Sequence, residues 1–402
     1  MTVTIEKSKA QGCVAAPPSK SVGHRALICG AFSAGSTIKN LGFCDDTNAT
    51  LGCLEKMGAD IKINNDSVTI GGLNPFCEMK DELFCNQSAS TLRFLVPIGM
   101  LNGADTLFCG SERLMQRPMD IYVDIAKKQD INFLQNEKGI TVGGRLKSGN
   151  YQIRGDISSQ FVTGLMFALS NLQNDSVIEI TGDFESASYV EITRDVMRMF
   201  GAEVEKSGDK TFKIKGKSQY KPIEYFVEGD YSNAAFLDAF NLLGGEVEVE
   251  GLNPQSSQGD RVYKQMFSDL KNGKRRFDLS DCPDLAPIMF SMAAAIGMVE
   301  FTGTKRLAIK ESDRAECMKS ELEKFGVKVD INPDGVIVYG GELKTPHATL
   351  FGHDDHRIVM ALSLLCCVTG GEIEGAEAVE KSFPEFFDVL KALKVSVKKD
   401  ET

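Results

Sequence analysis

The stretch Leu51–Gly72, LGCLEKMGADIKINNDSVTIGG, changes its hydrophobic period half-way along. Apolar residues follow a helical spacing up to the Gly-Ala pair at 58–59 and alternate with period two after it. This change predicts a helix that ends in a glycine turn and is followed by two short strands. The same transition recurs, after Gly-Ala or Gly-Val, in VMRMFGAEVEKSGDKTFKIKG (196–216) and ELEKFGVKVDINPDGVIVYGG (321–341).

A second pattern returns six times: a short polar, Ser- or Asp-rich element opens an apolar helix. The spacing is roughly 70 residues, with a shorter gap between the fourth and fifth copies. The two patterns together predict an α/β protein of six βαβαββ units, three in each half, divided near residues 225–229. Two domains also suit a chain of 402 residues. The six openings are PPSKSVGHRALIC (17–29), CNQSASTLRFLV (85–96), GDISSQFVTGLMFAL (155–169), EGDYSNAAFLDAF (228–240), DCPDLAPIMFSMAAA (281–295) and GHDDHRIVMALSLL (352–365).

Cations accompany these helix starts. A helix N-terminus has unpaired N–H groups and partial positive charge, so Ser and Asp there are explained by capping alone. Capping does not explain cations, which indicate an anionic ligand at the same place. Because such residues start elements throughout both halves, the pattern suits a cleft that binds two anionic small molecules. The cations are Lys20, Arg25, Arg117, Lys310, Arg314, Arg357 and Lys381.

Bulk composition excludes several classes of partner. A formal net charge of -11 argues against a nucleic-acid partner, which needs a broad basic surface. Eleven cysteines without a CxxC pair suggest neither a disulfide framework nor a zinc site, and fit a reducing compartment. The longest apolar run, 286–299, is too short to span a membrane, and the start MTVTIEKSKAQG lacks a signal-peptide core. We therefore expect a cytoplasmic protein with no membrane partner.

Two charged motifs have alternative interpretations. In KESDR (310–314), Lys310 and Arg314 would share a helix face and repel each other unless an anion bridges them. Glu311 beside them suits a general acid or base, and the alternative is a solvated charged helix. Asp284, in the Pro-Asp pair that opens an apolar helix, is either a cap or a base with a shifted pKa.

GHDDHR (352–357) resembles a metal-binding cluster at first sight. Four contiguous side chains point in divergent directions, however, and few of them could meet at one ion. We therefore favour a helix cap at Asp354 or Asp355, with Arg357 directed at an anion, and we expect no metal site.

Seven motifs in this order resemble the 5-enolpyruvylshikimate-3-phosphate synthase family, and the resemblance covers essentially the whole chain. It implies a two-domain inside-out α/β barrel with three repeats per domain. Residues 1–14 and 227–402 would form one domain and 15–226 the other, with the active site in the cleft between them. The motifs are SKSVGHRA (19–26), RPM (117–119), GDISSQF (155–161), PDLAP (283–287), KESDR (310–314), DDHR (354–357) and KSFPEFF (381–387).

The resemblance implies transfer of the enolpyruvyl group of phosphoenolpyruvate to the 5-hydroxyl of shikimate 3-phosphate, with release of phosphate. This is a step of aromatic amino-acid biosynthesis, and it needs acid–base groups and an anion cradle without metal or organic cofactor. A monomer is expected. The first motif of the family contains a lysine and an arginine, which Lys20 and Arg25 match in this sequence.

The resemblance also implies roles for individual residues. Asp284 matches the proton acceptor, Glu311 the proton donor, and Lys20 a catalytic lysine that touches both substrates. The residues that match the family's shikimate 3-phosphate site are Lys20, Ser21, Arg25, Ser158, Ser159, Gln160, Ser186, Asp284 and Lys310. Those that match its phosphoenolpyruvate site are Lys20, Ala89, Arg117, Gln160, Arg314, Arg357 and Lys381.

Two positions depart from the family pattern. The Asn-[Ser/Ala]-Gly-Thr turn reads Gln-Ser-Ala-Ser at 87–90, and the Arg common two residues before Lys310 is Ala308. Since glyphosate-sensitive members have glycine at the position of Ala89, the sequence predicts glyphosate tolerance.

Two other functions remain as alternatives. UDP-N-acetylglucosamine enolpyruvyl transferase shares the fold, but it opens with a Lys-Asn element and uses a loop cysteine. Here the element is Lys20-Ser21, and Cys109 lacks the expected surroundings. A non-catalytic anion-binding protein would not need Asp284 and Glu311 beside the cations, and a turnover assay separates it from an enzyme.

Overall fold

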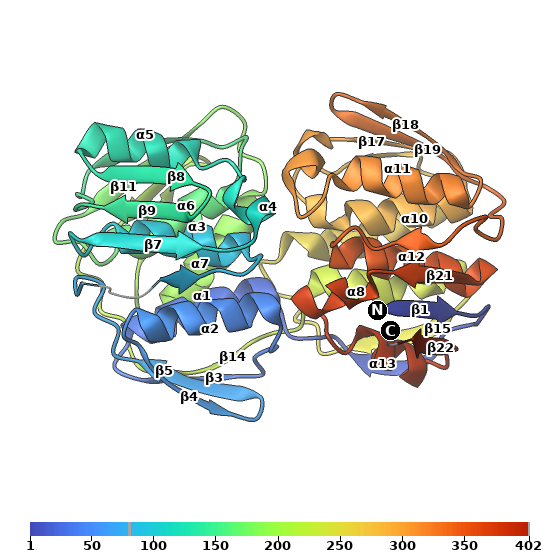
Figure 1. The fold of residues 1–402 in the computed structure, drawn as a ribbon, viewed down its shortest axis with the longest axis horizontal. Coiled ribbons are helices and arrows are strands. Elements are labelled where there is room, and N and C mark those ends of the chain that lie inside the picture. Colours follow the sequence, from blue (N-terminus) through green and yellow to red (C-terminus); the bar gives the residue numbers. More distant parts are fainter. Residues whose placement is uncertain (79–81, 401–402) are drawn as a thin grey trace. The chain divides into compact units, whose positions relative to one another are not determined.

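The computed structural model describes residues 1–78 and 82–400, and the chain divides into two compact units (Figure 1). Unit 1 combines Met1–Pro17 with Gly229–Thr402, and unit 2 is Pro18–Glu228. The boundaries expected from the sequence lie after residues 14 and 226. The boundaries in the structure lie after Pro17 and Glu228, three and two residues later. The chain therefore leaves unit 1 just before the first polar helix start and returns to it just before the fourth.

Unit 2 contains three four-stranded sheets with one shared strand order. If the four strands of a unit are counted along the βαβαββ pattern, their order across the sheet is first, second, fourth, third. The first and second strands pair parallel, and the fourth strand pairs antiparallel with both the second and the third. The late strand β14 takes the first place in one of them. The sheets are β14(Glu224–Phe226)-β3(Ser36–Lys39)-β5(Ser67–Gly71)-β4(Asp60–Asn64), β6(Leu83–Phe84)-β7(Asp105–Cys109)-β9(Gly139–Gly143)-β8(Asn132–Asn136) and β10(Asn150–Arg154)-β11(Ser176–Thr181)-β13(Thr211–Ile214)-β12(Val204–Ser207).

Unit 1 repeats this order in two of its sheets. The N-terminal strand β1 takes the fourth place in one of them, between β21 and β22, so the two ends of the chain share a sheet. The third sheet pairs β2 parallel with β15. The sheets are β16(Arg276–Asp278)-β17(Val299–Thr302)-β19(Gly335–Tyr339)-β18(Lys328–Asn332), β20(Leu350–Phe351)-β21(Gly371–Glu374)-β1(Thr2–Ile5)-β22(Val397–Asp400) and β15(Glu246–Glu250)-β2(Gln11–Ala15).

The predicted α/β architecture of six units is confirmed, with one correction. In the described part of the chain, the sheet of the fourth unit has two strands, so its final hairpin is missing. Only about 50 residues separate the fourth and fifth helix starts, compared with about 70 elsewhere. The 3-10 helix η2(Gly259–Val262) and helix α9(Tyr263–Lys271) occupy that shorter segment.

Six helices are buried on nearly every side, as expected for apolar helices enclosed by other elements. They are α1(Lys20–Phe32), α3(Ala89–Gly99) and α6(Ser159–Leu169) in unit 2, and α8(Tyr231–Asp238), α10(Ala286–Ile296) and α12(His356–Thr369) in unit 1. The others are more exposed or short: α2(Asp45–Lys56), α4(Glu112–Met115), α5(Asp120–Gln129), α7(Ala187–Met199), α11(Arg314–Lys324), α13(Phe386–Ala392), η1(Ala239–Leu243), η3(Pro283–Leu285), η4(Lys305–Ile309) and η5(Ala376–Lys381).

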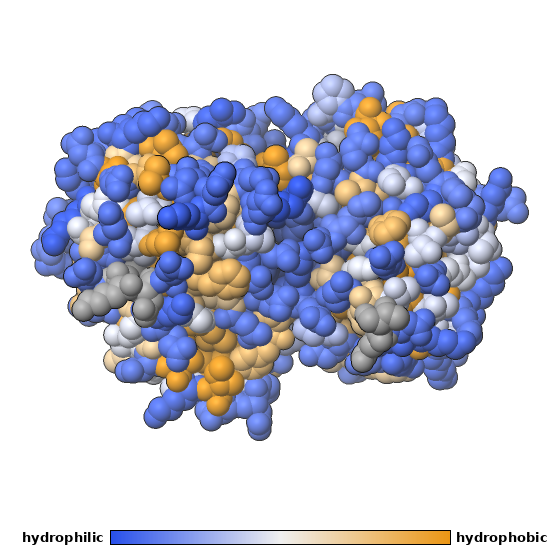
Figure 2. Space-filling model, in the orientation of Figure 1, coloured by the Kyte–Doolittle hydropathy of each residue, from blue (hydrophilic) through white to orange (hydrophobic). Residues whose placement is uncertain are grey.

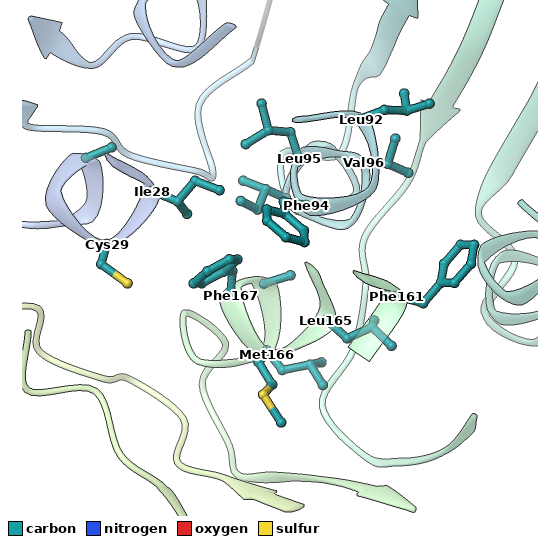
Figure 3. Close-up of a cluster of buried hydrophobic side chains, with 14 of the residues drawn as sticks. Ile28, Cys29, Leu92, Phe94, Leu95, Val96, Phe161, Leu165, Met166 and Phe167 are labelled. Carbon is teal, nitrogen blue, oxygen red and sulfur yellow. The ribbon is translucent and has the colours of Figure 1, made fainter. Parts of the chain in front are cut away.

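The core of unit 2 forms where α1, α3 and α6 meet (Figure 3). The rings of Phe94 and Phe167 contact each other edge to face, with centroids 5.8 Å apart. Helices α3 and α6 approach closely because residue 164 is glycine. A Cβ atom there would lie 2.2 Å from the carbonyl oxygen of Arg93 and 2.4 Å from the hydroxyl of Tyr122.

Hydrophilic residues cover most of the face seen in Figure 2, and the apolar residues there lie in smaller groups. Large apolar side chains that remain exposed come from separate elements, for example Ile63 on β4, Leu134 on β8 and Met199 on α7. Isolated apolar side chains of this kind are ordinary on protein surfaces. No helix within 1–78 and 82–400 combines the length and apolar character needed to cross a bilayer.

Candidate active site

The first cation of the sequence motif lies at the start of α1. Lys20 is the first residue of this helix, and its Nζ is 2.7 Å from Oδ2 of Asp46 in the first turn of α2. Only 16% of the Lys20 side chain and 13% of the Asp46 side chain are exposed. The ion pair therefore fixes a largely buried ammonium group at a helix N-terminus, next to Ser21.

Arg25 lies one turn further along α1 and is buried. Its Nε donates to Oγ1 of Thr193 (2.8 Å), while Nη1 and Nη2 donate to the carbonyl oxygens of Ser21 (2.6 Å) and Tyr189 (3.0 Å). Its guanidinium carbon is 5.0 Å from the centre of the Phe94 ring. Burial lowers the pKa of Arg25 to about 10, which still leaves the group charged at neutral pH.

Side-chain hydrogen bonds connect the start of α6 to the start of α3. Ser158 caps α6 by accepting a hydrogen bond from the Gln160 amide (3.3 Å). The side-chain Nε2 of Gln160 donates to Oγ of Ser90 (3.0 Å), and its Oε1 accepts from Nη1 of Arg93 (2.9 Å). Ala89, the first residue of α3, is 7% exposed. The structure thus brings together residues that the sequence assigns to both substrates.

Three further predicted residues lie in unit 2. Ser159 is buried in the first turn of α6. Ser186 is the N-cap of α7, is buried, and has a φ of 55°. Arg117 follows α4 and directly precedes Pro118. The roles of these residues stay predictions.

In unit 1 the predicted site residues gather around one carboxylate. Oδ1 of Asp284 accepts from Nη1 of Arg314 (2.7 Å) and from Nζ of Lys310 (3.3 Å). Oδ2 of Asp284 accepts from Nη2 of Arg357 (3.1 Å). Asp284 lies in η3, which leads directly into α10, so it is held at the start of an apolar helix.

The three cations outweigh burial in setting the charge of Asp284. Burial alone would raise the pKa of this carboxyl group, but Arg357, Lys310 and Arg314 hold its pKa well below the ordinary value. Burial also lowers the pKa of Lys310, an effect that the charge of Asp284 opposes. Asp284 is therefore ionised at neutral pH and bridges cations that would otherwise repel each other.

The helical interpretation of KESDR is wrong for residues 310–313. Helix α11 begins only at Arg314, because Asp313 is its N-cap and accepts from the Glu316 amide (3.2 Å). Lys310 has an extended backbone (φ -80°, ψ -163°), and Lys310 and Arg314 do not share a helix face. Both nevertheless contact Asp284, the bridging anion that the motif requires.

Arg314 contacts three carboxylates although it is 1% exposed. Its Nε lies 2.8 Å from Oδ2 of Asp355, and its Nη2 lies 2.8 Å from Oε2 of Glu311. Burial opposes the charge of Arg314, but Asp355, Glu311 and Asp284 raise its pKa well above the ordinary value. This arginine orders both acidic groups that the sequence assigns to proton transfer.

The GHDDHR motif provides a helix cap. Asp355 is the N-cap of α12 and accepts from the Arg357 amide (3.0 Å), which confirms that one of the two aspartates is a cap. Nζ of Lys381 donates to the carbonyl oxygen of Asp354. His353 is engaged elsewhere, since its Nε2 lies 2.8 Å from Oε1 of the buried Glu321. Within 1–78 and 82–400, no three His, Cys, Asp or Glu side chains are arranged to hold a metal ion.

Sequence reasoning missed a buried carboxylate beside this cluster. Asp260, in η2, is 2% exposed and accepts a hydrogen bond from the Ser232 hydroxyl. Burial and then the charge of Asp284 raise the pKa of Asp260 to about 6, while Arg357 acts to lower it. Nothing in the local stretch SQGDRV marks this residue, because only the fold brings η2 next to Asp284.

The comparison with known families covers almost the whole chain. Residues 5–390 match the model of EPSP synthase (3-phosphoshikimate 1-carboxyvinyltransferase). The chain belongs to the EPSP synthase family.

Relatives in this family cover nearly all of their own length and of this chain. The 3-phosphoshikimate 1-carboxyvinyltransferase of Clostridium kluyveri is 41% identical over an alignment of 415 positions, which covers 97% of each chain. The same enzyme of Clostridium acetobutylicum is 38% identical, again over 97% of each chain. Among solved structures, an EPSP synthase from Acinetobacter baumannii has a TM-score of 0.79 at 21% identity and covers 100% of both chains. This structural likeness supports the two-domain inside-out α/β fold.

Membership of the EPSP synthase family makes this chain a transferase of the shikimate pathway, in aromatic amino-acid biosynthesis. Its reaction is enolpyruvyl transfer to shikimate 3-phosphate. The alternative enolpyruvyl transferase, which acts on UDP-N-acetylglucosamine, is not favoured.

Proposed function

We propose that two groups of residues, one in each unit, perform this transfer on the same pair of substrates. The observation that carries the proposal is the cluster around Asp284, where one ionised carboxylate is contacted by Lys310, Arg314 and Arg357. Because Asp284 holds these three cations together, an anionic substrate that reaches the cluster can accept hydrogen bonds from the same ammonium and guanidinium groups. Phosphoenolpyruvate and shikimate 3-phosphate both carry the negative charge that such groups bind.

In unit 2, the helix starts bind the anionic groups of the substrates. Lys20 contacts both substrates, and Arg25 orients shikimate 3-phosphate together with the N-terminal turn of α6, Ser158–Gln160. A helix N-terminus presents unpaired N–H groups to an oxyanion, and the serine hydroxyls add further donors. The ion pair of Lys20 with Asp46 positions the ammonium group before a substrate binds.

In unit 1, Asp284 and Glu311 transfer protons. The 5-hydroxyl of shikimate 3-phosphate loses its proton to Asp284 and attacks C2 of phosphoenolpyruvate, while Glu311 protonates C3. Phosphate then leaves C2 of the tetrahedral intermediate while C3 returns a proton to the Glu311 carboxylate, so that the C2–C3 double bond forms and the product is an enol ether. Since substrate anions would engage Arg357 and Lys310, the cations that lower the pKa of Asp284 would be neutralised, and Asp284 would become a stronger base.

Phosphate release from phosphoenolpyruvate tests the function. We expect release that depends strictly on shikimate 3-phosphate and is unchanged by EDTA. Release that instead requires UDP-N-acetylglucosamine would identify the alternative transferase. Loss of turnover in EDTA, restored by a divalent metal, would contradict the metal-free reaction, and absence of turnover with either acceptor would favour an anion-binding protein.

We also propose that the protein works as a monomer in the cytoplasm. All eleven cysteines are free thiols in the structure, as expected in a reducing compartment. Sedimentation equilibrium should give the mass of a single chain, and a dimer mass at micromolar concentration would contradict the monomer.

A further inference from the structure

Five side-chain hydrogen bonds join five helices of unit 2 in a closed circuit, in which the helix backbones connect one bond to the next; we call this circuit the polar belt. It runs from α1 to α7, α6, α3 and α2, and back to α1. Its links are Arg25 Nε–Thr193 Oγ1 (2.8 Å), Thr193 Oγ1–Thr163 Oγ1 (2.8 Å), Gln160 Nε2–Ser90 Oγ (3.0 Å), Thr91 Oγ1–Thr50 Oγ1 (2.7 Å) and Thr50 Oγ1–His24 Nδ1 (2.7 Å).

The hydroxyl groups of the belt are not needed to fill the core. Thr50, Thr91, Thr163 and Thr193 are each 0% exposed and lie among apolar helices. Valine has nearly the same shape and would avoid the cost of burying a hydroxyl, which is about 1–3 kcal/mol when no partner compensates it. The hydrogen-bonding capacity of these threonines, and not their volume, therefore distinguishes them from ordinary core residues.

The belt contains or adjoins residues of the candidate active site at two places. On one side, Thr193 accepts from Arg25 Nε, while Thr163 links Thr193 to helix α6. The carbonyl oxygen of Tyr189, which accepts from Arg25 Nη2, also accepts from the Thr193 hydroxyl (3.0 Å). This side fixes the direction of the Arg25 guanidinium.

On the other side, the belt reaches the start of α3. Thr91 Oγ1 donates to Oγ of Ser88 (2.8 Å), the N-cap of α3, and Ser88 accepts from the Thr91 amide (3.2 Å). Thr50 joins this cap to the buried His24. Because Ala89 follows Ser88 directly, this side fixes the turn that the sequence assigns to phosphoenolpyruvate.

We propose that the polar belt positions the binding groups for the two substrates separately, Thr193 acting through Arg25 on shikimate 3-phosphate and Thr50 acting through Thr91 and Ser88 on phosphoenolpyruvate. Both threonines are positioning residues, since neither is assigned a substrate contact. The inference rests on the proposed function, because it assigns one substrate to each side of the belt.

Substitution of each threonine by valine tests the inference. Thr193→Val should raise the KM for shikimate 3-phosphate about tenfold, the effect of one lost charge-assisted hydrogen bond, and leave the KM for phosphoenolpyruvate within about twofold. Thr50→Val should show the opposite pattern. Thr193→Ser and Thr50→Ser keep the hydroxyl and should restore both constants to within about threefold of the wild type.

The control is Thr369→Val in unit 1, a buried threonine whose hydroxyl donates to the carbonyl oxygens of Leu365 and Gly370. It should leave both KM values unchanged. If a valine variant does not fold, alanine at the same position replaces it, and the same split is required.

Equal changes of both KM values in each variant, or no change in either, would overturn the belt's role. A wild-type protein without turnover would instead count against the proposed function.

Discussion

Ala89 is the residue for which the sequence predicts the most specific effect, tolerance of glyphosate. It begins α3 and is 7% exposed, and it directly precedes Ser90, which accepts a hydrogen bond from Gln160 Nε2. Glyphosate is longer than phosphoenolpyruvate, and an added methyl group in a filled site costs about 1–3 kcal/mol. We expect Ala89→Gly to increase inhibition by glyphosate about tenfold to a hundredfold, measured as the inhibition constant against phosphoenolpyruvate.

The control for this substitution is the KM for phosphoenolpyruvate, which should change much less than the inhibition constant. If Gln87 and Ser90 have already displaced the turn, Ala89 makes no contact with the inhibitor. Unchanged inhibition in Ala89→Gly would then refute the steric explanation.

Asp284 and Glu311 are the residues expected to carry the chemistry. Asp284→Asn and Glu311→Gln preserve shape but remove the proton acceptor and donor, so kcat should fall about a hundredfold or more in each. Phosphate release under saturating substrates measures the loss, and circular dichroism checks that the variants fold. Glu316→Gln, at an exposed position in the first turn of α11, is the matched control. Near-wild-type kcat in either site variant would remove its assigned role.

At the scale of elements, the approach of α3 and α6 depends on a missing side chain. A Cβ atom at Gly164 would lie 2.2 Å from the carbonyl oxygen of Arg93, a backbone atom that cannot turn away. Gly164→Ala should therefore lower the free energy of unfolding by about 1–3 kcal/mol, measured by urea denaturation.

Gly149→Ala is the matched control, because a Cβ atom there would have no neighbour within 4 Å. Its stability should stay close to that of the wild type. If the two alanine variants had the same free energy of unfolding, α3 and α6 could move apart without loss of stability.

The sequence was sufficient to predict elements where local signals are strong. Changes in hydrophobic period and polar helix starts indicate the six units. The short spacing between the fourth and fifth helix starts, before residue 281, is consistent with the missing hairpin of the fourth unit. The helical interpretation of 310–313 failed because Asp313 has two possible roles, as a helix residue and as a cap. Asp260 and the threonines of the polar belt could not be predicted, since their contacts join segments far apart in the chain.

At the scale of the whole molecule, each unit is completed by a segment distant in sequence. Strand β1 pairs with β21 and β22 in unit 1, and β14 pairs with β3 in unit 2. These pairings explain why the chain passes between the units twice. They also place Lys20, which we propose contacts both substrates, within three residues of the first passage at Pro17–Pro18.

Binding of one substrate, shikimate 3-phosphate, is expected to affect both units. If shikimate 3-phosphate contacts Lys20, Arg25 and Ser158–Gln160 as well as Asp284, its binding must stabilise both units. A ligand at a hundred times its Kd stabilises the folded state by about 2.7 kcal/mol. Amide hydrogens that exchange only after the ligand-binding structure opens should then exchange about a hundredfold more slowly. Hydrogen exchange measured by mass spectrometry should therefore slow at the starts of α1 and α6 and also at η3 and α11.

Inorganic phosphate at the same concentration is the control. Slowing confined to unit 2 would mean that Asp284 does not bind this substrate, and the assignment of its proton acceptor would fail with it.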